Sequence, residues 1–162
     1  MTAPTLADCR NAIWNAIDNW PALADAFAMK LRFDADDGDP EDGQPSISDF
    51  PAIAVGDVSV ATKTVMTQTQ EWAATFSILV WTQGWNYSRA NALIDPIIAA
   101  LYKSKPDGES VSYIKSATGF HLDSPPQLTQ QPVTLQDADD GGTKAILTTL
   151  KVTLKIHRNP FL

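Results

Sequence analysis

The carboxylates of this chain are the side chains whose spacing most directly suggests a chemical role. They are concentrated in two acidic stretches that also contain glycine: Asp34, Asp36, Asp37, Asp39, Glu41 and Asp42, and then Asp137, Asp139 and Asp140. A calcium-binding EF-hand loop needs oxygen ligands at positions one, three and five, glycine at six and glutamate at twelve. Counting from Asp34 places Gly38 at five and Pro45 at twelve. We therefore expect solvated loops and no metal site.

Other residue types that enzymes use are not arranged in a catalytic pattern. His121 and His157 have no cysteine, histidine or acid at ligand spacing, and neither a Gly-x-Ser-x-Gly elbow nor a phosphate-binding glycine loop occurs. Cys9 falls on the apolar stripe of an expected helix, where a thiol is a small core residue. We expect no enzymatic activity and no cofactor.

Composition narrows the class of protein further. The chain has 162 residues, 44% hydrophobic and 19% charged, with a net charge of −7 and a pI near 4.6. These values predict one globular domain spanning 1–162 and argue against general binding to a nucleic-acid backbone. An acidic surface still suits a protein past which DNA slides. Without a signal peptide or a long apolar run, we expect a soluble protein made in a reducing cytoplasm and no membrane contact.

Hydrophobic periodicity predicts the elements that position these residues. Three-to-four spacing indicates helices at Leu6–Trp20 and from Ser88 onward, the second kinked or restarted near Asp95 because of Pro96. A short helix should follow Pro21. Strict alternation predicts long strands at Glu71–Gln83 and Lys144–Arg158 and shorter ones before them, with a register shift at Gly56-Asp57.

These elements predict an α+β fold, with a mostly antiparallel twisted sheet and two main helices packed on one face. Two segments are expected outside it: an exposed acidic loop at about 34–46 and an irregular connection at about 117–142. The proline-rich part of that connection, Ser124–Pro132, should not join a central ladder.

Two groups of residues are the candidates for contacts with partners. Trp81 and Trp85 flank the end of the long strand, where they serve either as core or as anchors of a contact surface. Lys151 and Lys155 lie on the polar side of the last strand. One interpretation is an edge guarded by lysines; the other is a contact with the acidic loop of an identical subunit, including Asp36, Asp37, Asp39 and Glu41.

Four segments carry a resemblance to a known family: DFPAIAVGD, EWAATFSILVWTQ, GWNYSRAN leading into LIDPIIAAL, and the final LKVTLKIHR. In this order, after an N-terminal helix and an acidic loop, the pattern resembles the small tail-terminator (tail-completion) proteins of long-tailed bacteriophages. The resemblance extends from about Leu6 to Arg158. It departs from the family pattern at Pro96 and in the section Glu109–Asp140.

The resemblance implies a structural virion protein without catalysis. Such proteins form a hexameric ring that caps the tail tube, stops its polymerisation and joins the tail to the head connector. The implied partners are identical copies, the tail tube protein and the head-tail connector or stopper, with DNA passing through the lumen unbound. The implied location is the tail or neck of a virion assembled in the host cytoplasm. The alternatives are a connector or stopper component of the neck, and a monomeric ligand-binding or regulatory module that uses a pocket beneath the second helix.

Overall fold

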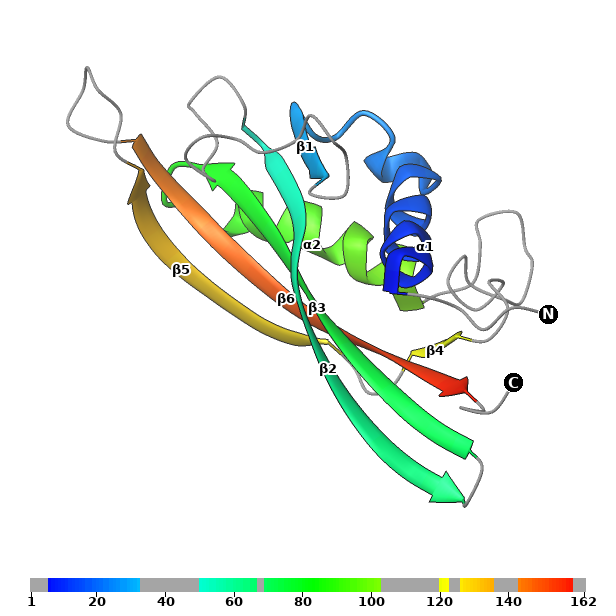
Figure 1. Cartoon of the computed structure of the whole chain (residues 1–162). Helices are drawn as coiled ribbons and strands as arrows, with labels where there is room; N and C mark the ends of the chain where they lie inside the picture. The colour runs from blue at the N-terminus through cyan, green and yellow to red at the C-terminus, as the bar shows by residue number, and fades with distance from the viewer. Residues whose placement is uncertain are drawn as a thin grey trace.

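In the described part of the chain, a six-stranded sheet carries two α-helices on one face (Figure 1). The computed structural model describes residues 6–32, 50–66, 69–102, 120–122, 126–135 and 143–158. The acidic loop at 34–46, the acids at 137–140 and the section 103–119 lie outside these ranges. The described elements are α1 (Leu6–Asp18), the 3₁₀ helix η1 (Pro21–Leu23), β1 (Met29–Arg32), β2 (Ala52–Met66), β3 (Thr69–Gln83), α2 (Tyr87–Tyr102), β4 (Phe120–Leu122), β5 (Gln127–Leu135) and β6 (Thr143–Arg158).

The sheet is mostly antiparallel, as the alternation pattern predicts. Its order is β1-β2-β3-β6, and β4 and β5 both pair with β6, each along a different stretch of that strand. Among the described strands, only the pairing of β1 with β2 is parallel. The strand predicted at Glu71–Gln83, β3, is central, between β2 and β6. The α+β fold and the placement of both helices on one face are therefore confirmed.

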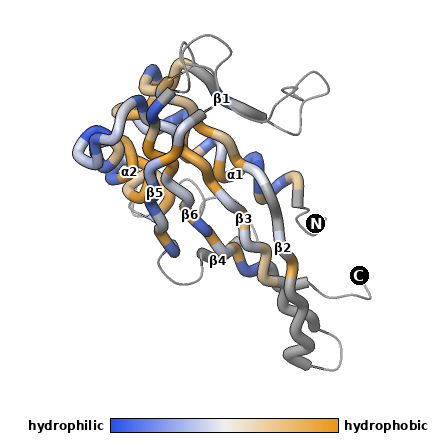
Figure 2. The backbone as a smooth tube through the Cα atoms, turned by 90° about the vertical axis from the view of Figure 1, so that its left-hand side faces the viewer, coloured by the Kyte–Doolittle hydropathy of each residue, from blue (hydrophilic) through white to orange (hydrophobic). Residues whose placement is uncertain are grey.

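The core lies between the helices and the sheet face that they cover. Alternate residues of β3 point into it and pair with alternate residues of β6, so that Phe76 faces Val152 and Ile78 faces Leu150. Both helices add apolar stripes, and Figure 2 shows that hydrophobic residues are concentrated in this layer. The fully buried large side chains include Trp14, Phe76, Ile13, Ile17, Leu23, Ile53, Ile78, Ile97, Leu101 and Leu150.

Cys9 is buried in this core, as predicted, and the burial changes its titration. Its side chain is 0% exposed, and desolvation, with a smaller contribution from Asp8, raises the pKa of the thiol from 9.0 to about 11. Above pH 9 the thiol of an unfolded chain ionises while the folded thiol keeps its proton. The unfolded state is therefore favoured as pH rises between 9 and about 11.

We expect this difference to appear in the pH dependence of stability. The free energy of unfolding of the wild type should fall more steeply between pH 9 and 11 than that of Cys9→Ala, by up to about 1.4 kcal/mol per pH unit. Urea titrations at several alkaline pH values measure the two slopes. Parallel slopes for the two proteins would show that the Cys9 thiol titrates alike when folded and unfolded.

Three details of the sequence prediction need correction, and one holds. Asn86 rather than Ser88 caps α2: its Oδ1 accepts hydrogen bonds from the backbone N–H groups of Ser88 (3.0 Å) and Arg89 (3.4 Å). The helix continues through Pro96, so the alternative of a restart at Asp95 is wrong, while the alternative of a kink stays a prediction. The predicted short helix after Pro21 is a single 3₁₀ turn. The register shift at Gly56-Asp57 is present, between Val55 and Val58.

A further prediction is wrong: β5 is a strand, although an irregular connection was predicted for this part of the chain. Gln127–Leu135 pairs with β6 along its whole length, with Pro132 opposite Ile146. A strand that pairs on one side only can hold a proline, because alternate backbone N–H groups of such a strand point away from its neighbour and have no ladder bond to lose. β5 pairs with β6 alone among the described strands, so Pro132 is compatible with the ladder.

Candidate functional site

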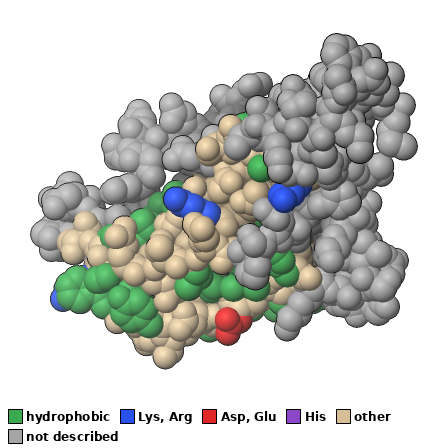
Figure 3. Space-filling model, turned by 90° about the horizontal axis from the view of Figure 1, so that it is seen from below, with side chains coloured by type: hydrophobic (Ala, Val, Ile, Leu, Met, Phe, Trp, Pro, Cys, Tyr) green, Lys and Arg blue, Asp and Glu red, His purple; other side chains and the backbone are tan. Residues whose placement is uncertain are grey.

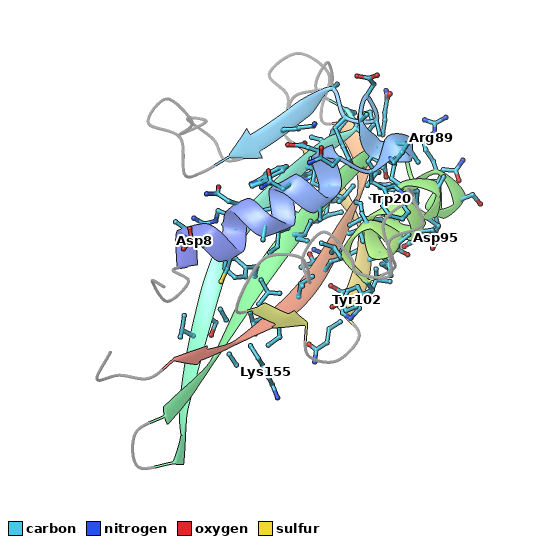
Figure 4. All side chains as sticks on the ribbon, turned by 90° about the vertical axis from the view of Figure 1, so that its right-hand side faces the viewer. Asp8, Trp20, Arg89, Asp95, Tyr102 and Lys155 are labelled. Atoms are coloured by element: carbon cyan, nitrogen blue, oxygen red, sulfur yellow. The ribbon has the colours of Figure 1, made fainter. Side chains whose placement is uncertain are left out.

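The sheet face opposite the helices carries hydroxyls and lysines. Val152 and Leu154 belong to the core, so Lys151, Thr153 and Lys155 point to the other side of β6. The hydroxyls of Thr75 and Thr153 lie 2.9 Å apart across the β3–β6 pair. Lys151 is exposed and Lys155 is partly exposed, pointing away from the helices in Figure 4. In the view from below, basic side chains lie among polar and hydrophobic ones (Figure 3).

The two tryptophans at the end of β3 have different environments. Trp81 is 4% exposed and belongs to a small second cluster with Ala52, Ala54 and Ala145, whose short side chains leave room for an indole ring. Trp85 lies in the turn after β3 and is 52% exposed. Its Nε1 donates to the Val133 carbonyl oxygen (3.3 Å), and the Lys144 ammonium lies 4.7 Å from its ring centroid. Trp85 is thus an exposed aromatic held in one orientation.

Gln130 of β5 joins three elements. Its Nε2 donates to the Asn91 Oδ1 of α2 (2.8 Å) and to the Thr148 Oγ1 of β6 (3.2 Å). Thr148 is 0% exposed on the core face of the sheet, so its hydroxyl has to find a protein partner. Through Gln130, the edge strand β5 therefore provides a hydrogen bond for the buried Thr148 hydroxyl of β6.

We expect Gln130→Ala to destabilise the protein by about 1–3 kcal/mol, because Thr148 would keep a buried hydroxyl without this donor. The double variant Gln130→Ala with Thr148→Val should recover much of the loss. Urea denaturation measures both. Gln131→Ala, at the exposed next position of the strand, is the control and should change stability by less than about 0.5 kcal/mol. Equal losses for the single and double variants would contradict the role of this bond.

A pocket of about 300 Å³ lies between the first half of α2 and the adjoining ends of β2 and β3. Arg89 and Ala92 are exposed and form part of its rim, while Thr82 is 1% exposed and forms part of its wall. The Thr82 Oγ1 is buried and has no hydrogen-bond partner among the described residues. The other described lining residues are Phe50, Pro51, Gln83 and Leu93.

The predicted site residues are only partly placed by the structure. Asp36, Asp37, Asp39 and Glu41 lie outside the described residues, so their contact with the Lys151 face stays a prediction. The side chains of His121 and His157 are not described either. The ligand-binding alternative placed a pocket beneath the second helix, but sequence reasoning did not identify its lining residues, because these are up to 43 positions apart (Phe50 to Leu93) and share no motif.

Within the described residues, no group of three or more His, Cys, Asp or Glu side chains could hold a metal ion. No helix among them is both long and apolar enough to cross a membrane.

Comparison with known proteins gives a fold relationship. No protein-family model matches this chain, and no curated protein does. The fold is similar to that of a chain in a solved structure described as "Virion of native gene transfer agent (GTA) particle". The two are 16% identical with a TM-score of 0.50, and the match covers 90% of this chain and 93% of the other. At this identity the likeness shows a shared fold across nearly the whole of both chains.

Proposed function

We propose that this chain is a structural component of a phage-like virion, and that within the virion it acts as the tail terminator. The observation that supports this most is the fold likeness to a chain of a gene transfer agent virion over 90% of the present chain. The sequence resemblance to tail terminators, from about Leu6 to Arg158, supports the same assignment independently of the structure.

The proposed mechanism is geometric. Copies of the chain form a closed hexameric ring on the last ring of the tail tube, which stops tube growth and presents a surface to the head connector. The net charge of −7 favours a lumen that does not hold DNA. Each copy acts by shape and contact surface, without a chemical step.

The shape of the subunit supports assembly with identical copies. The strands β2, β3 and β6 have 15 to 16 residues, so each spans about 50 Å, whereas the 16 residues of α2 span about 24 Å. The far part of this three-stranded sheet therefore extends beyond the helices (Figure 1). In the proposed ring, this extension contacts the neighbouring subunit.

Electron microscopy of the purified protein tests the proposal. We expect rings with six-fold symmetry, formed alone at high concentration or on the ends of purified tail tubes, and shorter tubes when the protein is added during tube polymerisation. A protein that stays monomeric at every concentration and leaves tubes unchanged would refute the proposal. Rings that bind head connectors but not tubes would assign the chain to the neck stopper.

A further inference from the structure

The volume and the lining residues of the pocket beside α2 suit the binding of one side chain. Four of its described lining residues are apolar: Phe50, Pro51, Ala92 and Leu93. Its volume of about 300 Å³ is sufficient for one aromatic or large aliphatic side chain and too small for a folded element. A side chain entering it would remove apolar surface from water on both partners.

Charge at the rim restricts what could bind there. Arg89 is the only charged residue among the described residues that line the pocket, and its guanidinium forms no ion pair within the described part of the chain. Figure 4 shows the Arg89 side chain pointing outward from its end of α2. An unpaired guanidinium beside an apolar cavity is complementary to a carboxylate next to an apolar group.

The wall of the pocket offers a third, independent observation. The Thr82 hydroxyl is buried, and no described residue forms a hydrogen bond with it, although burying a polar group in this way is unfavourable. The comparable buried threonine of β6, Thr148, is bonded by Gln130. Thr82 thus differs from Thr148 in lacking a partner, and it lies where a bound group could supply one.

We propose that this pocket binds a short acidic peptide segment of a partner protein. An aromatic or large aliphatic side chain of the segment fills the cavity, and an adjacent Asp or Glu carboxylate pairs with Arg89. The proposal does not rest on the tail-terminator assignment, because it follows from the lining residues alone. The proposal places the contact with the partner at one defined position, the pocket beside α2.

Nuclear magnetic resonance titration of the ¹⁵N-labelled full chain tests this binding. The probe is the peptide acetyl-Gly-Phe-Asp-Asp-Gly-amide. Two matched peptides replace either the phenylalanine by alanine or both aspartates by asparagine. We expect the probe to shift amide resonances around Thr82, Gln83 and the first half of α2, and both matched peptides to bind about tenfold more weakly.

Variants of the chain separate the two parts of the interaction. Ala92→Trp fills the cavity and should abolish binding, whereas Ala7→Trp, at an exposed alanine of α1, should leave it unchanged. Arg89→Gln should weaken binding about tenfold, and Arg89→Lys should recover part of it. Thr82→Val should weaken binding while the fold stays at least as stable, since it removes an unsatisfied hydroxyl.

Three results would overturn the proposal. Equal binding of all three peptides would show that the pocket does not recognise an apolar side chain together with a carboxylate. Resonance shifts elsewhere on the chain would show that the peptide binds at another place. If the pocket resonances move with protein concentration in the absence of peptide, and Ala92→Trp stops this, the occupant is a second copy of the chain and not a partner peptide.

Discussion

Phe76→Ala is expected to destabilise the protein by about 3–5 kcal/mol, a large part of the roughly 5–15 kcal/mol that holds a typical domain folded. The Phe76 ring is 0% exposed, and in the strand register its backbone position pairs with Val58 of β2 and Val152 of β6. The Arg10 guanidinium lies 5.8 Å from its ring centroid. Truncation therefore opens a cavity and removes the aromatic surface beneath a cation.

Urea denaturation followed by circular dichroism measures this loss. Leu128→Ala is the control, because it also truncates a large apolar side chain but at a position 45% exposed. It should cost much less, within about 1 kcal/mol. If Phe76→Ala and Leu128→Ala lower the denaturation midpoint equally, the ring of Phe76 does not contribute to the core as described.

Much of the fold around Phe76 could be predicted because it follows from short-range periodicity. Alternation in β3 and β6 indicates which side chains face the helices, and the stripe that includes Cys9, Ile13 and Ile17 indicates the buried side of α1. The register shift in β2 was also predictable, because the alternation changes phase at Gly56-Asp57. These features depend on neighbours within a few residues.

The errors arose where distant residues decide the local structure. Gln127–Leu135 contains glutamines and a proline and has no apolar alternation, yet it is a strand because β6 offers an unpaired edge. Gln130 fits there because Asn91 and Thr148 are within hydrogen-bond distance of its amide. These two partners lie 39 and 18 positions from Gln130 along the chain, so the sequence around Gln130 does not predict them.

The start of α2 shows a smaller error of the same kind. Both Asn86 and Ser88 are good capping residues, and composition alone does not choose between them. The backbone after β3 decides: Gly84 has a φ of +78°, and its N–H donates to the Lys144 carbonyl oxygen at 2.7 Å. This turn ends the strand early enough for Asn86 to cap the helix. The choice therefore depended on β6, which is about sixty residues further along the chain.

Reversing the charges of Lys151 and Lys155 to glutamate is expected to abolish ring assembly while leaving the subunit folded. Both lysines lie on the helix-free face of β6, on the opposite side from the core, so the substitutions should cost the monomer little. In the proposed ring they face the acidic loop of the next copy, and like charges would then repel across the contact. Size-exclusion chromatography with light scattering measures the oligomer, and circular dichroism checks the fold.

Arginine at both positions is the matched control and should assemble, since it keeps the charge at each site. The assembly of the wild type should also weaken as salt rises, because screening shortens the range of interaction between exposed charges to about 8 Å at physiological ionic strength. Assembly of the double glutamate variant at wild-type concentrations would refute the acid-base contact. The ring itself would then have to be held by apolar contacts such as those of Trp85, which is exposed and fixed by Val133 and Lys144. Trp85→Ala would become the decisive variant in that case, because it removes an aromatic anchor without changing any charge.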